Sequence, residues 1–348
     1  MDKQRLIFTD HIKEELKGVI ESFSDADRLF ILTDDHTQQL CWPLVEHIDA
    51  LLKAEHISIP SGEDHKTLES VSHVWNELQR MGATRHSLMI NLGGGLLTDL
   101  GGFAASTFKR GLRFVNVPTT LLAMVDASVG GKTGINFGGL KNEVGTFCTA
   151  NCVVVAPIFL QTLDNENMLS GYAEMLKHSL LADPALWAET LNMQLPISAS
   201  LLQRNVAVKQ HIVAEDPTEQ GLRKALNLGH TFGHAFEAMS FTTPHASLAH
   251  GYAVAYGLIC ELYLSAVKCG FPVDRMRQTV RFIHENYGHM SITCNDYPAL
   301  LELMHHDKKN RGDSINATLL ADIGDIRIDQ TVSKQDVEDA LDFYREGC

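Results

Sequence analysis

Short apolar runs alternate with amphipathic stretches along the first 165 residues of the chain. Five of these runs are rich in β-branched residues and close with Gly, Pro or Asp, as buried strands do. They cover residues 28–35, 56–60, 87–95, 112–118 and 151–157, and between the second and third lies a stretch with helical spacing and a glycine stop, residues 67–82. Alternating strands and helices predict a parallel sheet with nucleotide sites at the ends of its strands.

The pattern changes after about residue 165, where long runs repeat their apolar positions with a helical period. Each run predicts a helix; they cover residues 167–183, 198–216, 224–240 and 250–270. The sequence therefore predicts two domains: an α/β domain with a Rossmann-like parallel sheet over residues 1–164, and an all-α domain over residues 165–348. The cleft between two such domains is the expected place for the functional site.

The composition is that of a soluble globular protein, with 45 % hydrophobic and 21 % charged residues among 348 and a net charge of −14. This acidic balance argues against nucleic acid as a partner. The N-terminus carries no apolar signal core, and no window of about 18 residues is apolar and uncharged, so we expect no membrane partner. Seven scattered cysteines predict reduced thiols and a cytoplasmic location, and the Cys148–Cys152 spacing has no second pair to complete a zinc knuckle.

A glycine-rich segment, NLGGGLLTDLGGF over residues 91–103, follows a predicted strand and leads into a helix. Glycine lets backbone amides approach a phosphate, and a helix N-terminus adds partial positive charge, so the segment is either a nucleotide site or a tight turn with close packing. Asp34 ends the first predicted strand, where its carboxylate either meets a ribose hydroxyl or caps a turn.

The stretch over residues 117–147 is rich in Gly, Thr, Lys and Asn and shows little periodicity, which predicts a long irregular loop. Such loops in compact domains are usually functional. Lys132 and Lys141 lie within this stretch and Arg110 lies just before it. These cations could gather an anionic ligand in an otherwise acidic protein.

Two histidines, His230 and His234, lie four residues apart and share one face of a predicted helix. His250 begins another apolar helix, and Glu174 lies within an apolar helix, where a carboxylate is costly unless it is paired or ligated. Glu174, His230 and His250 would form a metal site with an open position, as catalytic zinc prefers. The chemistry of the residues alone leaves open which histidines bind.

Nine motifs, in order over residues 28–325, resemble those of the 3-dehydroquinate synthases within the sugar phosphate cyclase family. They are SGEDHK, GGGLLTDLGGF, KRG, VPTTLLAMVDASVGGKTGIN, KNEVGTF, GYAEMLKH, EQGLRKALNLGHTFGHAFE, HGYAVAYGL and DKKN. The resemblance implies a homodimer that uses NAD and one divalent metal, zinc or cobalt. It implies conversion of 3-deoxy-D-arabino-heptulosonate 7-phosphate to 3-dehydroquinate and phosphate, the second step of the shikimate pathway.

The resemblance also implies a role for each matching position. The metal ligands are Glu174, His230 and His250, whereas Glu219 and His234 form the acid–base pair. The expected NAD contacts are Glu63, Lys66, Gly94, Gly95, Asp99, Thr119, Thr120, Lys141 and Thr162. Asp34 is added to them because it ends the first predicted strand. Substrate contacts are expected from Arg110, Asp126, Lys132, Asn142, Lys177, Lys209, Arg223, Asn227 and one lysine of the DKK sequence, Lys308 or Lys309, of which Lys308 is preferred. Asp126 and Lys132 also count as catalytic.

Two positions depart from the family pattern. Tyr252 follows His250-Gly251 where the family usually has Glu, and Leu140 precedes Lys141-Asn142 in the loop. The departures bear on the surroundings of the metal and on loop closure. Three other functions are alternatives: a cyclase for another sugar phosphate, a metal-dependent polyol dehydrogenase, and a non-enzymatic NAD-binding protein. Arg223, Asn227 and the DKK lysines favour the heptulosonate, because they match the residues that hold its carboxylate.

Overall fold

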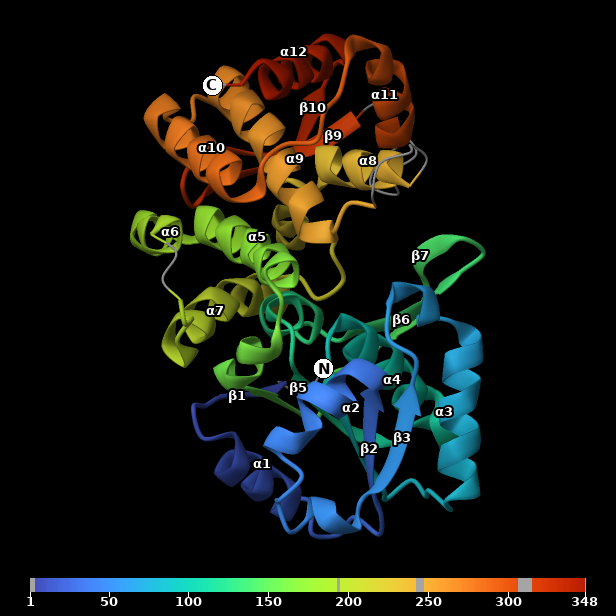
Figure 1. Ribbon diagram of the computed structural model, residues 1–348. Coiled ribbons are helices and arrows are strands. Elements are labelled where there is room, and N and C mark those ends of the chain that lie inside the picture. The colour runs from blue at the N-terminus through green and yellow to red at the C-terminus, as the bar shows by residue number, and fades with distance from the viewer. Residues whose placement is uncertain (1–3, 193–194, 242–246, 306–314, 348) are drawn as a thin grey trace. The chain divides into compact units, whose positions relative to one another are not determined.

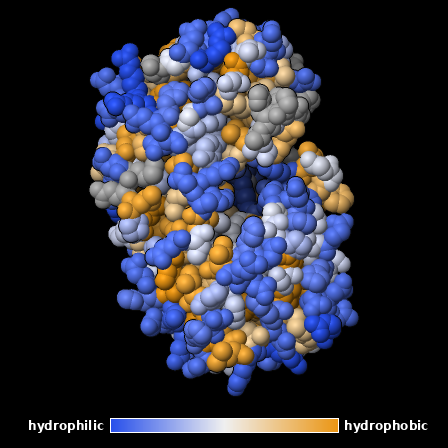
Figure 2. All heavy atoms as spheres, in the orientation of Figure 1, coloured by the Kyte–Doolittle hydropathy of each residue, from blue (hydrophilic) through white to orange (hydrophobic). Residues whose placement is uncertain are grey.

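A computed structural model describes residues 4–192, 195–241, 247–305 and 315–347 of the chain. The chain divides into two compact units, which we call the N-terminal and C-terminal units. The N-terminal unit comprises residues 1–164 and 196–206, and the C-terminal unit comprises residues 165–195 and 207–348. The visible face of the molecule is mostly hydrophilic, with apolar groups scattered over it (Figure 2).

The N-terminal unit is built on a six-stranded sheet in the order β1-β8-β5-β4-β2-β3, and all of its strand pairs are parallel (Figure 1). The strands are β1 (Arg5–Phe8), β2 (Leu29–Asp34), β3 (Glu55–Ile59), β4 (Leu88–Gly93), β5 (Arg113–Pro118) and β8 (Cys152–Val155). The last five match the five predicted runs, so the expected parallel sheet is confirmed. The pattern missed β1, because this four-residue edge strand is only partly buried and its apolar run, residues 6–8, is short.

Four helices connect and cover these strands: α1 (Ile12–Glu21), α2 (Asp35–Leu40), α3 (Leu68–Arg80) and α4 (Gly95–Thr107). The predicted helix over residues 67–82 is α3; Thr67 Oγ1 accepts a hydrogen bond from the Ser70 amide 3.3 Å away, and Gly82 with φ 74° follows its end. From β2 the chain continues to β3, at one edge of the sheet. From β4 it continues to β5, which lies on the opposite side of the neighbouring pair β2 and β4. The carboxyl ends of β2 and β4 therefore form a topological switch point, where open α/β sheets bind their ligands.

The stretch over residues 117–147 is not the irregular loop that its composition predicts. It contains a π-helix, Ala123–Ala127, and an antiparallel hairpin of β6 (Lys132–Phe137) and β7 (Leu140–Phe147). Gly138 and Gly139 connect the strands with φ of 60° and 81°, and a two-residue hairpin turn of this kind needs positive φ at both positions. The Gly-Gly pair is the sequence feature that indicates a hairpin. However, β7 is exposed along almost its whole length, so no buried apolar face marks it as a strand.

The C-terminal unit consists mainly of helices. They are α5 (Asn165–Ala182), α6 (Pro184–Leu191), α7 (Ala199–Glu215), α8 (His230–Ser240), α9 (His250–Leu264), α10 (Val273–Tyr287), α11 (Tyr297–His305) and α12 (Lys334–Glu346); the start of α7 belongs to the N-terminal unit. The unit also contains an antiparallel hairpin of β9 (Ile315–Asp322) and β10 (Asp325–Val332), which corrects the all-α prediction. The alternation around Ile326 and Ile328 carries the period of a strand.

Helices α8 and α9 pack closely because glycines line their contact. A Cβ at Gly257 would lie 1.9 Å from the Gly229 carbonyl oxygen, and one at Gly233 would lie 2.9 Å from the Ala253 carbonyl oxygen. By length and composition the run His250–Cys269 could cross a membrane, but 67 % of its most apolar window is buried, as in the core helix of a soluble protein.

Shorter helical turns complete the connections. They are the 3₁₀ helices Trp42–Leu44, Leu51–Lys53, Glu63–His65, Phe108–Arg110, Pro157–Thr162, Leu222–Asn227 and Cys294–Asp296, and the π-helix Ser265–Cys269 after α9.

Candidate active site

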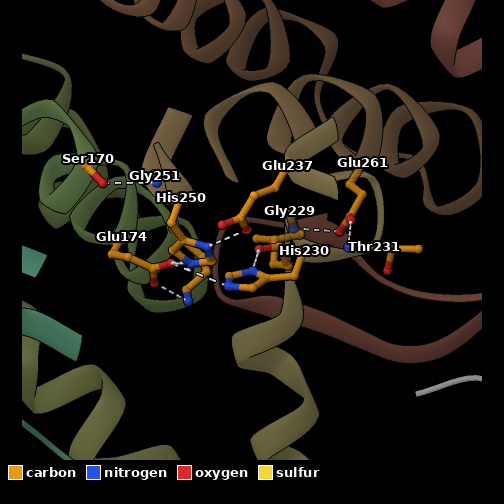
Figure 3. Close-up of polar contacts among 11 residues, drawn as sticks. Ser170, Glu174, Gly229, His230, Thr231, Glu237, His250, Gly251 and Glu261 are labelled. Atoms are coloured by element: carbon orange, nitrogen blue, oxygen red, sulfur yellow. Dashed lines mark hydrogen bonds and ion pairs between the residues drawn. The ribbon is translucent and has the colours of Figure 1, made fainter. Parts of the chain in front are cut away.

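Glu174, His230 and His250 come together in the C-terminal unit from three different helices (Figure 3). Glu174 lies within α5, and each histidine is the first residue of its helix, α8 or α9. Glu174 Oε1 lies 3.5 Å from His230 Nε2 and 3.7 Å from His250 Nε2. Two ligands on a tetrahedral zinc ion are separated by roughly 3.3 Å, given bonds of about 2.0–2.1 Å. The spacing therefore suits three ligands around one cation better than it suits direct hydrogen bonds.

The Glu174 carboxylate is buried, with 1 % of its side chain exposed. Neither oxygen has a well-formed hydrogen bond within the described residues, although Lys177 forms an ion pair with Oε2. Burial tends to raise the pKa of Glu174, but Lys177 and His250 outweigh it and hold the pKa well below its usual range. A buried, ionised carboxylate of this kind is stabilised by coordinating a cation.

Hydrogen bonds at Nδ1 fix the tautomers of the two candidate histidine ligands. His230 Nδ1 lies 3.1 Å from the Leu228 carbonyl oxygen, and His250 Nδ1 lies 3.1 Å from Glu237 Oε2. Both acceptors require a proton on Nδ1, which leaves the Nε2 lone pair free to bind a metal on the Glu174 side. Burial lowers the pKa of His250, but Glu174 and Glu237 raise it to about 10, so the surroundings of this ring favour positive charge.

His234 lies one turn farther along α8 and is not a member of this trio. Its ring centroid is 5.3 Å from that of His230 and 6.2 Å from that of His250. The histidine is therefore close to the candidate metal centre without contributing to its three donors. A role for His234 in proton transfer stays a prediction.

Glu261 holds the first turn of α8, although the sequence analysis did not single it out. The first amides of a helix lack partners within the helix, and Gly229, at the N-cap position, has no side chain to supply one. From α9, the buried Glu261 carboxylate accepts the Gly229 amide at 2.7 Å and the Thr231 amide at 2.9 Å (Figure 3). It also accepts the Phe232 amide at 3.5 Å. The His230 ligand thus sits on a turn that is held by a charged acceptor.

Asp216 organises the loop that carries Glu219 and Arg223. Its carboxylate accepts backbone amides from Gln220 at 3.0 Å, Gly221 at 2.7 Å and Arg223 at 3.0 Å. Arg223 is buried and donates to the Pro217 carbonyl at 2.7 Å. Within the same loop region, Asn227 Nδ2 lies 3.5 Å from Glu219 Oε1. The structure thus brings three predicted site residues into one segment.

Backbone strain coincides with three of the predicted site residues. Five described non-glycine residues have positive φ, and three of them are Arg110, Asn142 and Glu219, with φ of 67°, 53° and 63°; the other two, Lys109 and Asp329, are not predicted site residues. Such conformations are costly for residues with a side chain and cluster at functional sites.

Asp216→Asn is expected to lower kcat for phosphate release about 10- to 100-fold, because small displacements of reacting groups cost that much. The amide keeps one acceptor oxygen but presents hydrogens to a backbone amide, so the loop around Glu219 loses its arrangement. The matched control is Glu215→Gln, which removes one charge from the exposed neighbour that pairs with His211. An equal loss of kcat in both variants would contradict the role given to Asp216.

In the N-terminal unit, Lys66 is the centre of a polar cluster. Its buried ammonium donates to Asp99 Oδ2 and to Asn142 Oδ1, each at 2.6 Å. Burial raises the pKa of Asp99, and Lys66 opposes that shift. Asn136 joins the cluster by donating to Glu63 Oε1 at 2.9 Å and accepting the Asn142 amide at 2.9 Å. Three predicted cofactor residues and one predicted substrate residue therefore share one network, which the sequence did not reveal.

Other predicted cofactor residues lie at the carboxyl ends of the central strands. Gly94 follows β4 and precedes α4, and a Cβ there would lie 2.8 Å from Thr120 Cγ2, so this turn packs too closely for a side chain. The Thr119 amide donates to the Gly93 carbonyl at 3.0 Å, which ties the segment after β5 to the end of β4. Asp34 ends β2 and caps α2, where it accepts the Thr37 amide at 2.7 Å. The cap is one of the two alternatives that the sequence left open; the ribose contact stays a prediction.

The remaining predicted residues are placed as follows. Gly95 begins α4, Asp126 lies in the π-helix, Lys132 begins β6, Lys141 lies in β7, and Lys209 is buried in α7. Thr162 Oγ1 lies 3.6 Å from Cys41 Sγ. Lys308 is outside the described residues.

Comparison with known proteins gives the chain its family. Residues 56–170 match the 3-dehydroquinate synthase N-terminal model and residues 171–310 match the 3-dehydroquinate synthase C-terminal model. The whole chain is 50 % identical to the 3-dehydroquinate synthase of Parabacteroides distasonis, of which it covers 99 %. The chain belongs to the 3-dehydroquinate synthase family. A second member of this family, from Streptococcus pneumoniae, is 35 % identical over 90 % of both chains.

Solved structures agree with the fold expected for a 3-dehydroquinate synthase. The 2-epi-5-epi-valiolone synthase ValA from Streptomyces hygroscopicus, with NAD⁺ and Zn²⁺ bound, is 26 % identical with a TM-score of 0.82 over 99 % of this chain and 98 % of its own. A 2-deoxy-scyllo-inosose synthase is 21 % identical with a TM-score of 0.83, over 99 % of this chain and 96 % of that one. The latter likeness concerns the fold alone. The resemblance drawn from the nine motifs is thus confirmed.

Proposed function

We propose that this chain is a metal- and NAD-dependent 3-dehydroquinate synthase that converts 3-deoxy-D-arabino-heptulosonate 7-phosphate to 3-dehydroquinate and phosphate. The observation that carries the proposal is the trio of Glu174, His230 and His250, found in a chain that is 50 % identical to a curated member of the family over its full length. By the family resemblance, the reaction is a transient oxidation, loss of phosphate, re-reduction and aldol closure, and it has no net redox change.

The C-terminal unit would hold the metal through Glu174 and the Nε2 atoms of His230 and His250. A divalent metal bound there supplies Lewis acidity, which lowers the pKa of a substrate hydroxyl. Zinc and cobalt suit this mixed nitrogen and oxygen donor set. Three donors also leave a coordination position for the substrate.

The cations of the C-terminal unit would bind the acidic groups of the substrate. Three of these cations are buried: Lys177, Lys209 and Arg223, which are 2 %, 6 % and 3 % exposed. Buried cations are retained in proteins where they pair with anions, and the substrate carries both a carboxylate and a phosphate. Lys177 already pairs with Glu174, so it links the metal ligand to the substrate contacts. Glu219 and His234 would move protons, and Asn227 lies within reach of Glu219.

The N-terminal unit would bind NAD at the switch point between β2 and β4. Gly94 and Gly95 open the first turn of α4, where backbone amides and the helix N-terminus favour a pyrophosphate. The Lys66–Asp99 pair would fix the hairpin residue Asn142 beside this site. We assign NAD binding to the domain over residues 1–164 and metal and substrate binding to the domain over residues 165–348.

Phosphate release from the heptulosonate phosphate, measured with and without a chelator, tests the proposal. We expect release that stops when the metal is removed and returns when Zn²⁺ or Co²⁺ is added, with no accumulation of NADH. Turnover of sedoheptulose 7-phosphate in place of the heptulosonate would identify a different cyclase. That alternative has support in the fold shared with ValA.

Net NADH formation from a polyol would instead identify a dehydrogenase. An iron-containing alcohol dehydrogenase shares the fold at 13 % identity, with a TM-score of 0.64, over 99 % of this chain and 98 % of its own. We further propose a cytoplasmic homodimer, as the family resemblance implies; sedimentation of the purified chain tests the oligomeric state.

A further inference from the structure

We propose that Glu237 is a positioning residue that fixes the tautomer and orientation of His250 for metal binding. The inference rests on the metal centre of the proposed function, and it concerns a residue to which the family motifs gave us no role. Glu237 lies on α8, and its Oε2 is 3.1 Å from His250 Nδ1 at the start of α9 (Figure 3).

The burial of Glu237 makes this contact effective. The Glu237 side chain is only 9 % exposed, so water screens its charge weakly, whereas the His250 side chain is 33 % exposed. A carboxylate accepts only from a protonated Nδ1, and the other nitrogen, Nε2, lies on the Glu174 side. A carboxylate behind a histidine ligand fixes the ring and raises the basicity of its donor nitrogen.

The backbone of the two helices supports the same arrangement. The Gly251 amide, next to His250, donates to Ser170 Oγ at 3.1 Å, and a Cβ at Gly251 would lie 1.9 Å from the Ser170 carbonyl oxygen. The first turn of α9 is thus pressed against α5, the helix of Glu174. With the backbone held in this way, the Glu237 contact restrains the side-chain torsions that orient the His250 ring.

The neighbouring residue Tyr252 supplies no carboxylate to His250. It occupies the position after His250-Gly251 at which the family usually has a glutamate. Its ring instead packs against those of Tyr287, with centroids 5.2 Å apart, and Tyr256, at 6.5 Å. Within the described part of the chain, the carboxylate on the Nδ1 side of His250 is that of Glu237.

The test is a Co²⁺ titration of the metal-free full-length chain, followed by the visible absorption band of bound cobalt. Glu237→Ala is expected to weaken Co²⁺ affinity about 10- to 100-fold and to alter the band, because the ring loses its fixed orientation. Glu237→Gln is expected to weaken Co²⁺ affinity only several-fold. Its amide oxygen still accepts a hydrogen bond from Nδ1, but more weakly than a charged carboxylate does. The charge-matched control is Glu285→Gln, at an exposed residue that pairs with Arg281 on α10; we expect wild-type affinity.

Wild-type affinity and a wild-type band in Glu237→Ala would overturn the proposal. If this variant does not fold, as judged by its melting temperature without metal, Glu237→Gln decides, and unchanged Co²⁺ affinity there overturns the proposal too. The titration does not depend on turnover. A wild-type chain that binds Co²⁺ tightly but releases no phosphate would refute the proposed function and leave the role of Glu237 intact.

Discussion

Replacing Glu174 with alanine is expected to abolish metal binding and to reduce phosphate release to the background rate. The carboxylate is the one acidic donor of the trio, and its loss leaves two imidazoles beside the Lys177 ammonium. That ammonium repels a divalent cation once its partner is gone. Metal analysis of the purified variant and a phosphate-release assay in added Zn²⁺ measure the two effects.

Melting temperatures distinguish two effects of this variant: the uncompensated Lys177 charge and the loss of a metal ligand. Removing one partner of a buried ion pair costs about 3–5 kcal/mol, so Glu174→Ala should also lower the melting temperature of the metal-free protein. The double variant Glu174→Ala/Lys177→Met removes the uncompensated charge. It is expected to recover much of the melting temperature but neither metal nor activity, and a double variant that binds metal would rule out Glu174 as a ligand.

Replacing His234 with alanine is expected to leave metal content unchanged and to lower kcat about 100- to 10,000-fold, the usual range for a general acid or base. The ring lies 5.3 Å from that of His230, centroid to centroid, but is not part of the trio. The metal content and the kcat of the same preparation measure the two effects. The companion variant His230→Ala should lose both metal and activity. If His234→Ala were isolated without metal, the division of roles between the two histidines would be wrong.

The sequence predicted the strands and helices whose apolar pattern is strong. Four strands, β2, β4, β5 and β8, are buried along nearly their whole lengths. A continuous apolar run in the sequence predicts such a strand. The hairpin of β6 and β7 was not predicted because β7 is exposed along almost its whole length and β6 is buried only in its middle, so neither strand shows a continuous buried apolar run. The hairpin of β9 and β10 escaped because the expectation of an all-α domain outweighed the local alternation.

The metal trio could be proposed from residue types, but the residues that support it could not. Glu237, Glu261 and Asp216 act through contacts with groups up to 32 residues away in the chain, as Glu261 does with the Gly229 amide. No local pattern distinguishes such a carboxylate from one at the surface. The same holds for Lys66, because its partner Asn142 lies 76 residues farther along the chain.

The three donors of the metal centre belong to α5, α8 and α9, which are separate segments of the chain. A bound ion would thus cross-link these helices, and the unfolded chain has no preformed site for it. Free metal at about 100 times its dissociation constant would then add roughly 2.7 kcal/mol to the free energy of unfolding. The heat resistance of this protein is therefore set in part by the supply of metal in its surroundings.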